Sequence, residues 1–249
     1  MATLRLDKFL ADMQVGTRSQ VKDYIKKNRI RVNGKLVSSA ELKVDTTDCE
    51  VMFDGKRVAY TQTEYYMLNK PAGVLSATMD KKAETVLDLI VDKSRKDLFP
   101  VGRLDRDTEG LLLITNDGAL AHNLLSPKKH VDKKYFARVS GPIADRFIEE
   151  FAKGLRIDED FTAMPAVLEI LGYNSENDMT EVYITIREGK FHQIKRMFEA
   201  IGSEVLFLKR LSMGPLVLDK ELAAGEYRKL TDEEIEMLYA HEAHSVKTE

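Results

Sequence analysis

The segment from residue 101 to residue 118 constrains this chain most, because a dense group of charges leads directly into a fully apolar run. Residues 111–114 are Leu-Leu-Leu-Ile, and Asn116-Asp117-Gly118 follows them as turn residues. A short apolar run closed in this way is typical of a buried strand. The segment therefore predicts a strand in the middle of a sheet, entered through a charged loop.

Asp105 is the candidate reactive group of that loop. It lies between Arg103 and Arg106, and neighbouring cations favour the charged form of a carboxylate. A loop held by a core strand is a rigid mount for a reactive side chain. A solvated, charged loop is the alternative interpretation. A paired-carboxylate glycoside hydrolase using Asp105 and Asp107 is disfavoured, because two carboxylates two residues apart do not by themselves flank a bond.

Composition excludes several classes of protein. A length of 249 residues allows one small and one medium domain, and the 43% hydrophobic and 32% charged residues are those of a globular protein. No stretch approaches the roughly 20 apolar residues of a membrane span, and the first residues are amphipathic, unlike a signal peptide. Cys49 is the single cysteine, and no Cys/His cluster has metal-ligand spacing. We expect a cytoplasmic protein without a membrane or metal association.

The N-terminal residues predict an RNA-binding unit. Residues 1–36 carry nine basic and three acidic side chains, although the net charge of the chain is −3. Residues 6–13 have helical apolar spacing, Thr17 or Ser19 can cap a second helix, and Asn33-Gly34 is a strong hairpin signal. A basic row on such a unit suits phosphate oxygens. The predicted contacts are Arg5, Lys8, Arg18, Ser19, Lys22, Lys26, Arg29 and Arg31.

Residues 54–63 are polar and weakly patterned, so we interpret them as a linker between domains 1–60 and 61–249. Residues 65–68 predict a strand that ends in the turn Asn69–Gly73, where Lys70 is a candidate RNA-backbone contact. Residues 85–91 predict a short helix before the central loop.

Strands and helices interleave irregularly in the remaining chain, which predicts an α+β fold rather than a parallel doubly wound one. In the segment 191–198, Phe191, Ile194 and Phe198 are expected to form the buried side of a helix. Thr231 and Glu234 form a capping box for the last helix. The other predicted strands are 135–139, 166–171, 180–187 and 205–210, and the other predicted helices are 118–125 and 144–153.

Several motifs together resemble a known family. Gly102-Arg103-Leu104-Asp105, followed by Asp107-Thr108-x-Gly110-Leu111, resembles the central motif of pseudouridine synthases of the RluA/RsuA superfamily. Lys133-x-Tyr135 and Gly189-x-x-His192-Gln193-Ile194-Lys195 resemble the second and third motifs, and Asn69-Lys70-Pro71-x-Gly73 resembles the opening of the catalytic domain. Arg5–Leu10, Arg18-Ser19 and Val32-Asn33-Gly34 resemble an S4 RNA-binding domain. The resemblance covers nearly the whole chain and is strongest to the RsuA family.

This resemblance implies an S4 domain followed by a catalytic domain with a bent, mixed, mainly antiparallel sheet, flanking helices and a cleft across its middle. It implies isomerisation of uridine to pseudouridine with no cofactor. Asp105 would act as nucleophile on the sugar or the base, or as the base that removes a sugar proton; these roles stay open. Tyr135 would stack on the uracil, and Lys195 would pair with Asp105.

The same resemblance suggests further RNA contacts. Arg103 would fill the space left by the flipped uridine or hold a phosphate, and Arg196 would contact RNA. His192 is interpreted as a structural histidine or RNA contact rather than a general base. Asp107 would support the loop.

The substrate is expected to be 16S ribosomal RNA in a pre-ribosomal particle, with the enzyme a monomer. The choice of 16S rests on overall resemblance, which includes residues 125–130 and 151–154. The alternatives are the same reaction on 23S ribosomal RNA, or a non-catalytic S4-domain factor in ribosome assembly.

Overall fold

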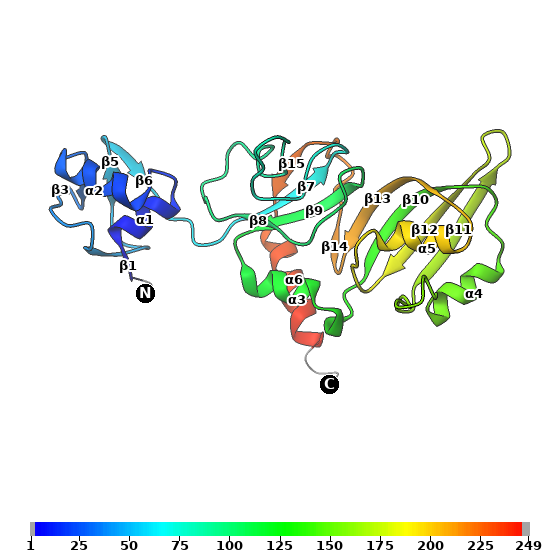
Figure 1. Cartoon of the computed structure of the whole chain (residues 1–249). Helices are drawn as coiled ribbons and strands as arrows, with labels where there is room; N and C mark the ends of the chain where they lie inside the picture. The colour runs from blue at the N-terminus through cyan, green and yellow to red at the C-terminus, as the bar shows by residue number, and fades with distance from the viewer. Residues whose placement is uncertain (1–2, 246–249) are drawn as a thin grey trace. The chain divides into compact units, whose positions relative to one another are not determined.

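The computed structural model describes residues 3–245, which divide into two compact units (Figure 1). Unit 1 consists of Met1–Glu64 together with Val91–Leu98. Unit 2 consists of Tyr65–Ile90 and Phe99–Glu249. The chain therefore crosses between the units at three points, and each unit is described by itself below.

Unit 1 has the predicted helix-helix-hairpin order. The side chains of Leu6, Phe9 and Leu10 are buried in its core, and Thr17 and Gln20 form a capping box at the second helix. Asn33 and Gly34 have positive φ angles, as the hairpin turn requires. Its elements are β1 (Thr3–Arg5), α1 (Leu6–Asp12), α2 (Arg18–Lys26), β2 (Ile30–Val32), β3 (Lys35–Leu36), β4 (Lys43–Asp45), β5 (Val51–Phe53) and β6 (Lys56–Val58).

The interpretation of residues 54–63 as a linker is wrong for its first half. β5 and β6 form a second hairpin, which extends the β3-β2-β5-β6 sheet. Asp54 and Gly55 both have positive φ angles at its turn. Asp-Gly after the apolar residues 51–53 is a hairpin signal, but the polar Lys56 and Arg57 that follow it concealed the second strand.

The segment Val91–Leu98 packs within unit 1, although the predicted boundary at residue 60 put it in the second domain. Arg95 is 3% exposed, and its guanidinium lies 2.5 Å from the Asp97 carboxylate and 3.6 Å from that of Asp12. The Glu64 carboxylate accepts hydrogen bonds from the backbone amides of Ser94 and Arg95. Paired charges thus fix a segment that has no regular secondary structure.

Unit 2 is built on one mixed sheet with the strand order β11-β12-β10-β13-β9-β7-β15, which confirms the α+β class. β9 and β13 run parallel, and the other pairs between named strands of residues 3–245 are antiparallel. The strands are β7 (Tyr65–Lys70), β8 (Phe99–Pro100), β9 (Glu109–Thr115), β10 (Lys133–Ser140), β11 (Val167–Asn174), β12 (Met179–Ile186), β13 (Val205–Met213), β14 (Leu216–Val217) and β15 (Tyr227–Lys229).

The predicted central strand is β9. Its residues 111–114 are completely buried, and β9 pairs with β7 on one side and β13 on the other. Gly110 has φ +98°, and a Cβ atom there would lie 2.3 Å from the Arg210 carbonyl oxygen of β13. Only glycine therefore fits this close parallel approach between the two halves of the sheet.

Helices cover parts of both halves (Figure 1). They are α3 (Gly118–Leu125), α4 (Arg146–Lys153), α5 (Gln193–Ala200) and α6 (Asp232–Ser245), with a short 3₁₀ turn at Pro127–Lys129. Thr231 and Glu234 make the predicted capping box of α6. Among the helices of residues 3–245, none combines the length and apolar character needed to cross a membrane.

Two helix predictions fail. Residues 85–91 form turns, in which the Thr85 hydroxyl and amide both donate to the Asp88 carboxylate. Phe191 lies outside α5 and is 76% exposed, whereas Ile194 and Phe198 are buried as predicted. The apolar spacing predicted the helix correctly, but its expected start at Phe191 lies two residues before the observed start at Gln193.

Candidate active site

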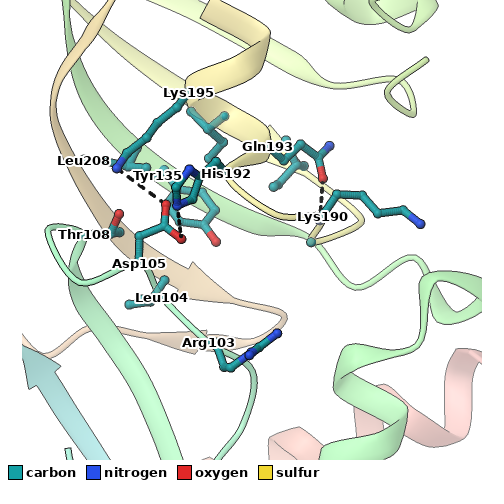
Figure 2. A pocket seen from close by; sticks show the side chains of 13 residues that line it. Arg103, Leu104, Asp105, Thr108, Tyr135, Lys190, His192, Gln193, Lys195 and Leu208 are labelled. Atoms are coloured by element: carbon teal, nitrogen blue, oxygen red, sulfur yellow. Dashed lines mark hydrogen bonds and ion pairs between the residues drawn. The ribbon is translucent and has the colours of Figure 1, made fainter. Parts of the chain in front are cut away.

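Three sequence-predicted residues come together in one pocket from separate elements (Figure 2). Asp105 lies on the loop that enters β9, Tyr135 lies on β10, and Lys195 lies on the first turns of α5. The pocket has a volume of about 70 Å³. It opens beside a wider cleft of about 670 Å³, a size typical of ligand sites.

The Asp105 carboxylate is the charged centre of this pocket, and its side chain is 26% exposed. Its Oδ2 atom lies 3.6 Å from Lys195 Nζ, and its Oδ1 atom lies 3.8 Å from His192 Nε2. Both distances are too long for direct hydrogen bonds. Asp105 therefore has the Lys195 ammonium and the His192 ring nearby but is not locked by them, which leaves its oxygens available to a substrate.

Lys195 makes its direct hydrogen bonds to Asp107. The ammonium Nζ lies 2.7 Å from both carboxylate oxygens of that residue. This hydrogen bond lowers the pKa of Asp107 below its usual value. Lys195 thus bridges two carboxylates, and Asp107 holds it next to Asp105.

Tyr135 forms an apolar wall of the pocket and is 7% exposed. It lies on the inner face of β10, because the odd-numbered residues of this strand point inward. Ile186 of β12 and Leu208 of β13 line the same pocket. Such a wall excludes water and offers a flat ring against a planar base.

The predicted RNA contact by Lys70 is wrong. Its side chain is completely buried, and Nζ donates hydrogen bonds to the backbone carbonyls of Pro71, Arg106 and Thr108. Burial lowers the pKa of Lys70 to about 8. All three of its donors are used, so Lys70 holds the loop around Asp105 instead of a phosphate. A lysine beside Pro and Gly gives no sequence signal for this burial.

Thr108 is a pocket residue that sequence reasoning did not single out. It is 2% exposed and lines the pocket, and its Oγ1 atom has no hydrogen-bond partner among residues 3–245 (Figure 2). A buried hydroxyl normally has a partner, because leaving it unpaired costs free energy. Thr108 Oγ1 is therefore a buried hydroxyl beside the pocket whose hydrogen-bonding capacity is unused.

The loop before α5 is fixed by buried polar contacts. Gln193 donates to the Glu188 carboxylate at 2.8 Å and accepts from the Lys190 amide at 3.0 Å. Glu188 also accepts from the Met164 amide. These bonds hold His192, which has φ +49°, at the edge of the pocket.

The wider cleft is lined by cationic side chains. Arg103 and Lys190 are exposed at its rim, and Lys133 is 4% exposed in its wall. Burial, with a smaller effect from the positive charge of Arg210, lowers the pKa of Lys133 to about 8. Arg196 lies elsewhere, because its guanidinium is paired with the Asp158 carboxylate and lies over the Phe161 ring.

In unit 1, the predicted RNA contacts fall into two groups. One group is exposed and lies mostly on α2: Arg18, Ser19, Lys22, Lys26 and Arg31; Arg5, in the other group, is exposed as well. The others are paired with acids of the same unit: Arg5 with Asp7, Lys8 with Asp12, and Arg29 with Asp54. The exposed α2 group is the better suited to bind an external phosphate.

Comparison with known families assigns both parts of the chain. Residues 64–200 match the model described as RNA pseudouridylate synthase, and residues 4–48 match the S4 domain. The chain is therefore an RNA pseudouridine synthase that carries an S4 domain. This agrees with a carboxylate in a pocket lined by an aromatic ring and basic side chains.

Relatives place it more closely, in the RsuA family. It is 41% identical to ribosomal small subunit pseudouridine synthase A of Escherichia coli, over 93% of this chain and 98% of that one. It is 47% identical to the uncharacterized RNA pseudouridine synthase YtzG of Bacillus subtilis, over 94% and 98%. Ribosomal large subunit pseudouridine synthase B of B. subtilis is 38% identical, over 95% and 96%. A crystal structure of a pseudouridylate synthase, 37% identical, has a TM-score of 0.65 and covers 94% and 99%.

Proposed function

We propose that this enzyme isomerises one uridine of 16S ribosomal RNA to pseudouridine, acting in the cytoplasm as a monomer on a pre-ribosomal particle. The observation that carries the proposal is the convergence of Asp105, Tyr135 and Lys195 on one pocket in a chain of this family. The similarity to small subunit pseudouridine synthase A, over nearly the full length of both chains, supports the choice of 16S RNA.

In this proposal the target uridine leaves its stack and enters the pocket, at a cost of a few kcal/mol. The uracil stacks on Tyr135, and the Asp105 carboxylate attacks the sugar or the base, or removes a sugar proton. Cleavage of the C1′–N1 bond frees the uracil, which rotates so that C5 bonds to C1′. The proton displaced from C5 must finally reach N1, so atoms balance without a redox partner.

Lys195 and Thr108 have supporting roles in the proposed reaction. The ammonium of Lys195, 3.6 Å from Asp105, stabilises negative charge when the site is closed to water. The unpaired Thr108 hydroxyl hydrogen-bonds to the uracil and so fixes its orientation before and after rotation. Asp107 holds Lys195 in place through its two hydrogen bonds.

The S4 domain supplies affinity in this proposal. The exposed Lys22 and Lys26 of α2 contact phosphates of the structured RNA, so binding should weaken as salt rises. Replacing both by Gln should weaken RNA binding and reduce its salt dependence, while leaving single-turnover chemistry at saturating enzyme unchanged. Unchanged affinity at physiological salt would contradict this division of roles.

The decisive experiment is pseudouridine mapping of 16S and 23S ribosomal RNA from cells that lack this protein. The cells are complemented with wild type, Asp105→Asn or Asp105→Ala. We expect one 16S site to disappear and to return only with wild type. Restoration by both variants would exclude Asp105 as the reacting group.

The same reaction on 23S ribosomal RNA is the second candidate, because a large subunit pseudouridine synthase is 38% identical over a similar share of this chain. Loss of a 23S site in the mapping experiment would favour it. A non-catalytic assembly role would be favoured if neither RNA changed.

A further inference from the structure

Phe191 is the most exposed aromatic residue at the cleft, with 76% of its surface accessible. A phenylalanine of this exposure leaves a large apolar surface in water. It belongs to the loop that carries His192 and is continuous with α5 and Lys195. Its position is therefore fixed by the same elements that position the active site.

The Phe191 ring is held in a defined orientation. It stacks on the His192 imidazole with ring centroids 3.8 Å apart and an interplanar angle of 19°. His192 is in turn 3.8 Å from Asp105, measured from Nε2 to Oδ1. The two rings thus form a short stack that leads from the Asp105 pocket into the wider cleft, and the end formed by Phe191 is accessible.

The surroundings of Phe191 indicate what could occupy this position. Arg103, Lys133 and Lys190 line the same cleft and supply positive charge. Two acidic side chains line the cleft, Asp105 and Glu188, and Glu188 is buried and accepts hydrogen bonds from Gln193 and the Met164 amide. A flat ring beside cationic side chains suits a nucleotide, which combines a planar base with a phosphate. A purely apolar peptide would leave these cations unpaired.

We propose that Phe191 is a stacking platform for an unpaired base next to the target uridine. The base stacks on the accessible face of Phe191, while the uridine occupies the Asp105 pocket. The platform holds the strand open and fixes how far the uridine can enter. This inference rests on the pseudouridine synthase activity and not on which ribosomal RNA is the substrate.

The test uses the full-length enzyme and a synthetic RNA stem-loop that contains the uridine identified by mapping, from either ribosomal RNA. Wild type is compared with Phe191→Ala and Phe191→Trp. Tyr173→Ala is the matched control, because Tyr173 is an exposed aromatic residue of β11 that lines none of the described pockets. Thermal unfolding of each variant shows whether it is folded. Because Phe191 is exposed, its replacement should not change stability.

Base stacking on an aromatic side chain contributes about 1–3 kcal/mol, which corresponds to about 5- to 150-fold in affinity. We expect a loss of this size in RNA affinity for Phe191→Ala, recovery with Phe191→Trp, and no loss for Tyr173→Ala. The proposed role of Phe191 would be overturned if Phe191→Ala bound the stem-loop as tightly as wild type. An effect on ribosomal particles but not on the stem-loop would assign the residue to a protein contact instead.

Abasic nucleotides then locate the stacked base. Each nucleotide flanking the uridine is replaced in turn by an abasic one. With the wild-type enzyme, an abasic nucleotide at one position should weaken binding as much as Phe191→Ala does. With Phe191→Ala, an abasic nucleotide at that one position should cause no further loss of binding. Equal sensitivity of the wild type and the variant at every position would refute the platform. A lower turnover rate with unchanged RNA affinity would instead show that Phe191 acts only by orienting His192.

Discussion

Gly110→Ala tests whether the close approach of β9 and β13 assembles the active site. The new Cβ would lie 2.3 Å from the Arg210 carbonyl oxygen and 2.8 Å from its amide nitrogen. Carbon and oxygen atoms rarely approach below 3 Å, so the two strands must separate by a large fraction of an ångström. The conformation adds its own cost, because a side chain at positive φ is disfavoured by about 1–2 kcal/mol.

Overpacking of this kind costs about 1–3 kcal/mol in addition, so the expected loss of unfolding free energy is about 2–5 kcal/mol. Gly225→Ala provides the matched control, because Gly225 has φ +91° and a Cβ there would contact nothing within 4 Å. The control should lose only about 1–2 kcal/mol. Urea unfolding measures the loss of unfolding free energy in both variants, and the difference between the two losses is the cost of the steric contact at residue 110.

The substitution should also lower catalysis. β9 positions Asp105, while β13 supports β10 and therefore Tyr135. Misplacing reacting groups by about 1 Å can reduce the rate on the order of 100-fold. Single-turnover pseudouridine formation, measured where both variants are folded, should fall for Gly110→Ala and not for Gly225→Ala. Equal stability and equal rates for the two variants would refute the reasoning.

Three further outcomes follow from single side chains. Lys70→Met should lower the unfolding free energy by about 2–4 kcal/mol, because three backbone carbonyls lose their donor; an unchanged urea midpoint would contradict this. Thr108→Val should raise stability by about 1 kcal/mol by removing an unpaired buried hydroxyl, while lowering kcat/KM; unchanged kcat/KM would exclude the proposed uracil contact. Lys133 has a pKa of about 8, against a usual 10.5, so the unfolded chain binds more protons between these values and stability should rise with pH there. Measured by urea unfolding and relative to Lys133→Met, the unfolding free energy of the wild type should rise by about 2 kcal/mol between about pH 7 and 9.5. If the two proteins showed parallel pH profiles of unfolding free energy, the lowered pKa of Lys133 would be contradicted.

The sequence predicted the parts of the fold that have a local signature. The buried run of β9, a cap of the second helix at Thr17 or Ser19, which is Thr17 in the structure, and the Asn33-Gly34 hairpin were all correct, since each depends on neighbouring residues alone. The family motifs placed Asp105, Tyr135 and Lys195 in one pocket, which periodicity could not do because they lie on three separate elements.

The errors concern features decided by distant contacts. Lys70 is buried because backbone carbonyls from residues 106 and 108 surround its ammonium group, and no local pattern encodes that. Phe191 continues the helical spacing of Ile194 and Phe198, but the backbone turns at His192 and leaves it exposed. Lys195 pairs with Asp105 as expected, at 3.6 Å, but its direct hydrogen bonds to Asp107 were not predicted. Tertiary geometry decides each of these cases.

The return of Val91–Leu98 to unit 1 has a consequence for engineering. The RNA-binding unit is discontinuous in sequence, so no single cut can release it or transplant it intact. Removing residues 1–60 would leave Arg95, which is 3% exposed, without Asp12. A chimera that exchanges substrate recognition between members of this family must carry both segments. Loss of activity in a simple N-terminal truncation would therefore measure damage to the remaining chain as well as loss of RNA affinity.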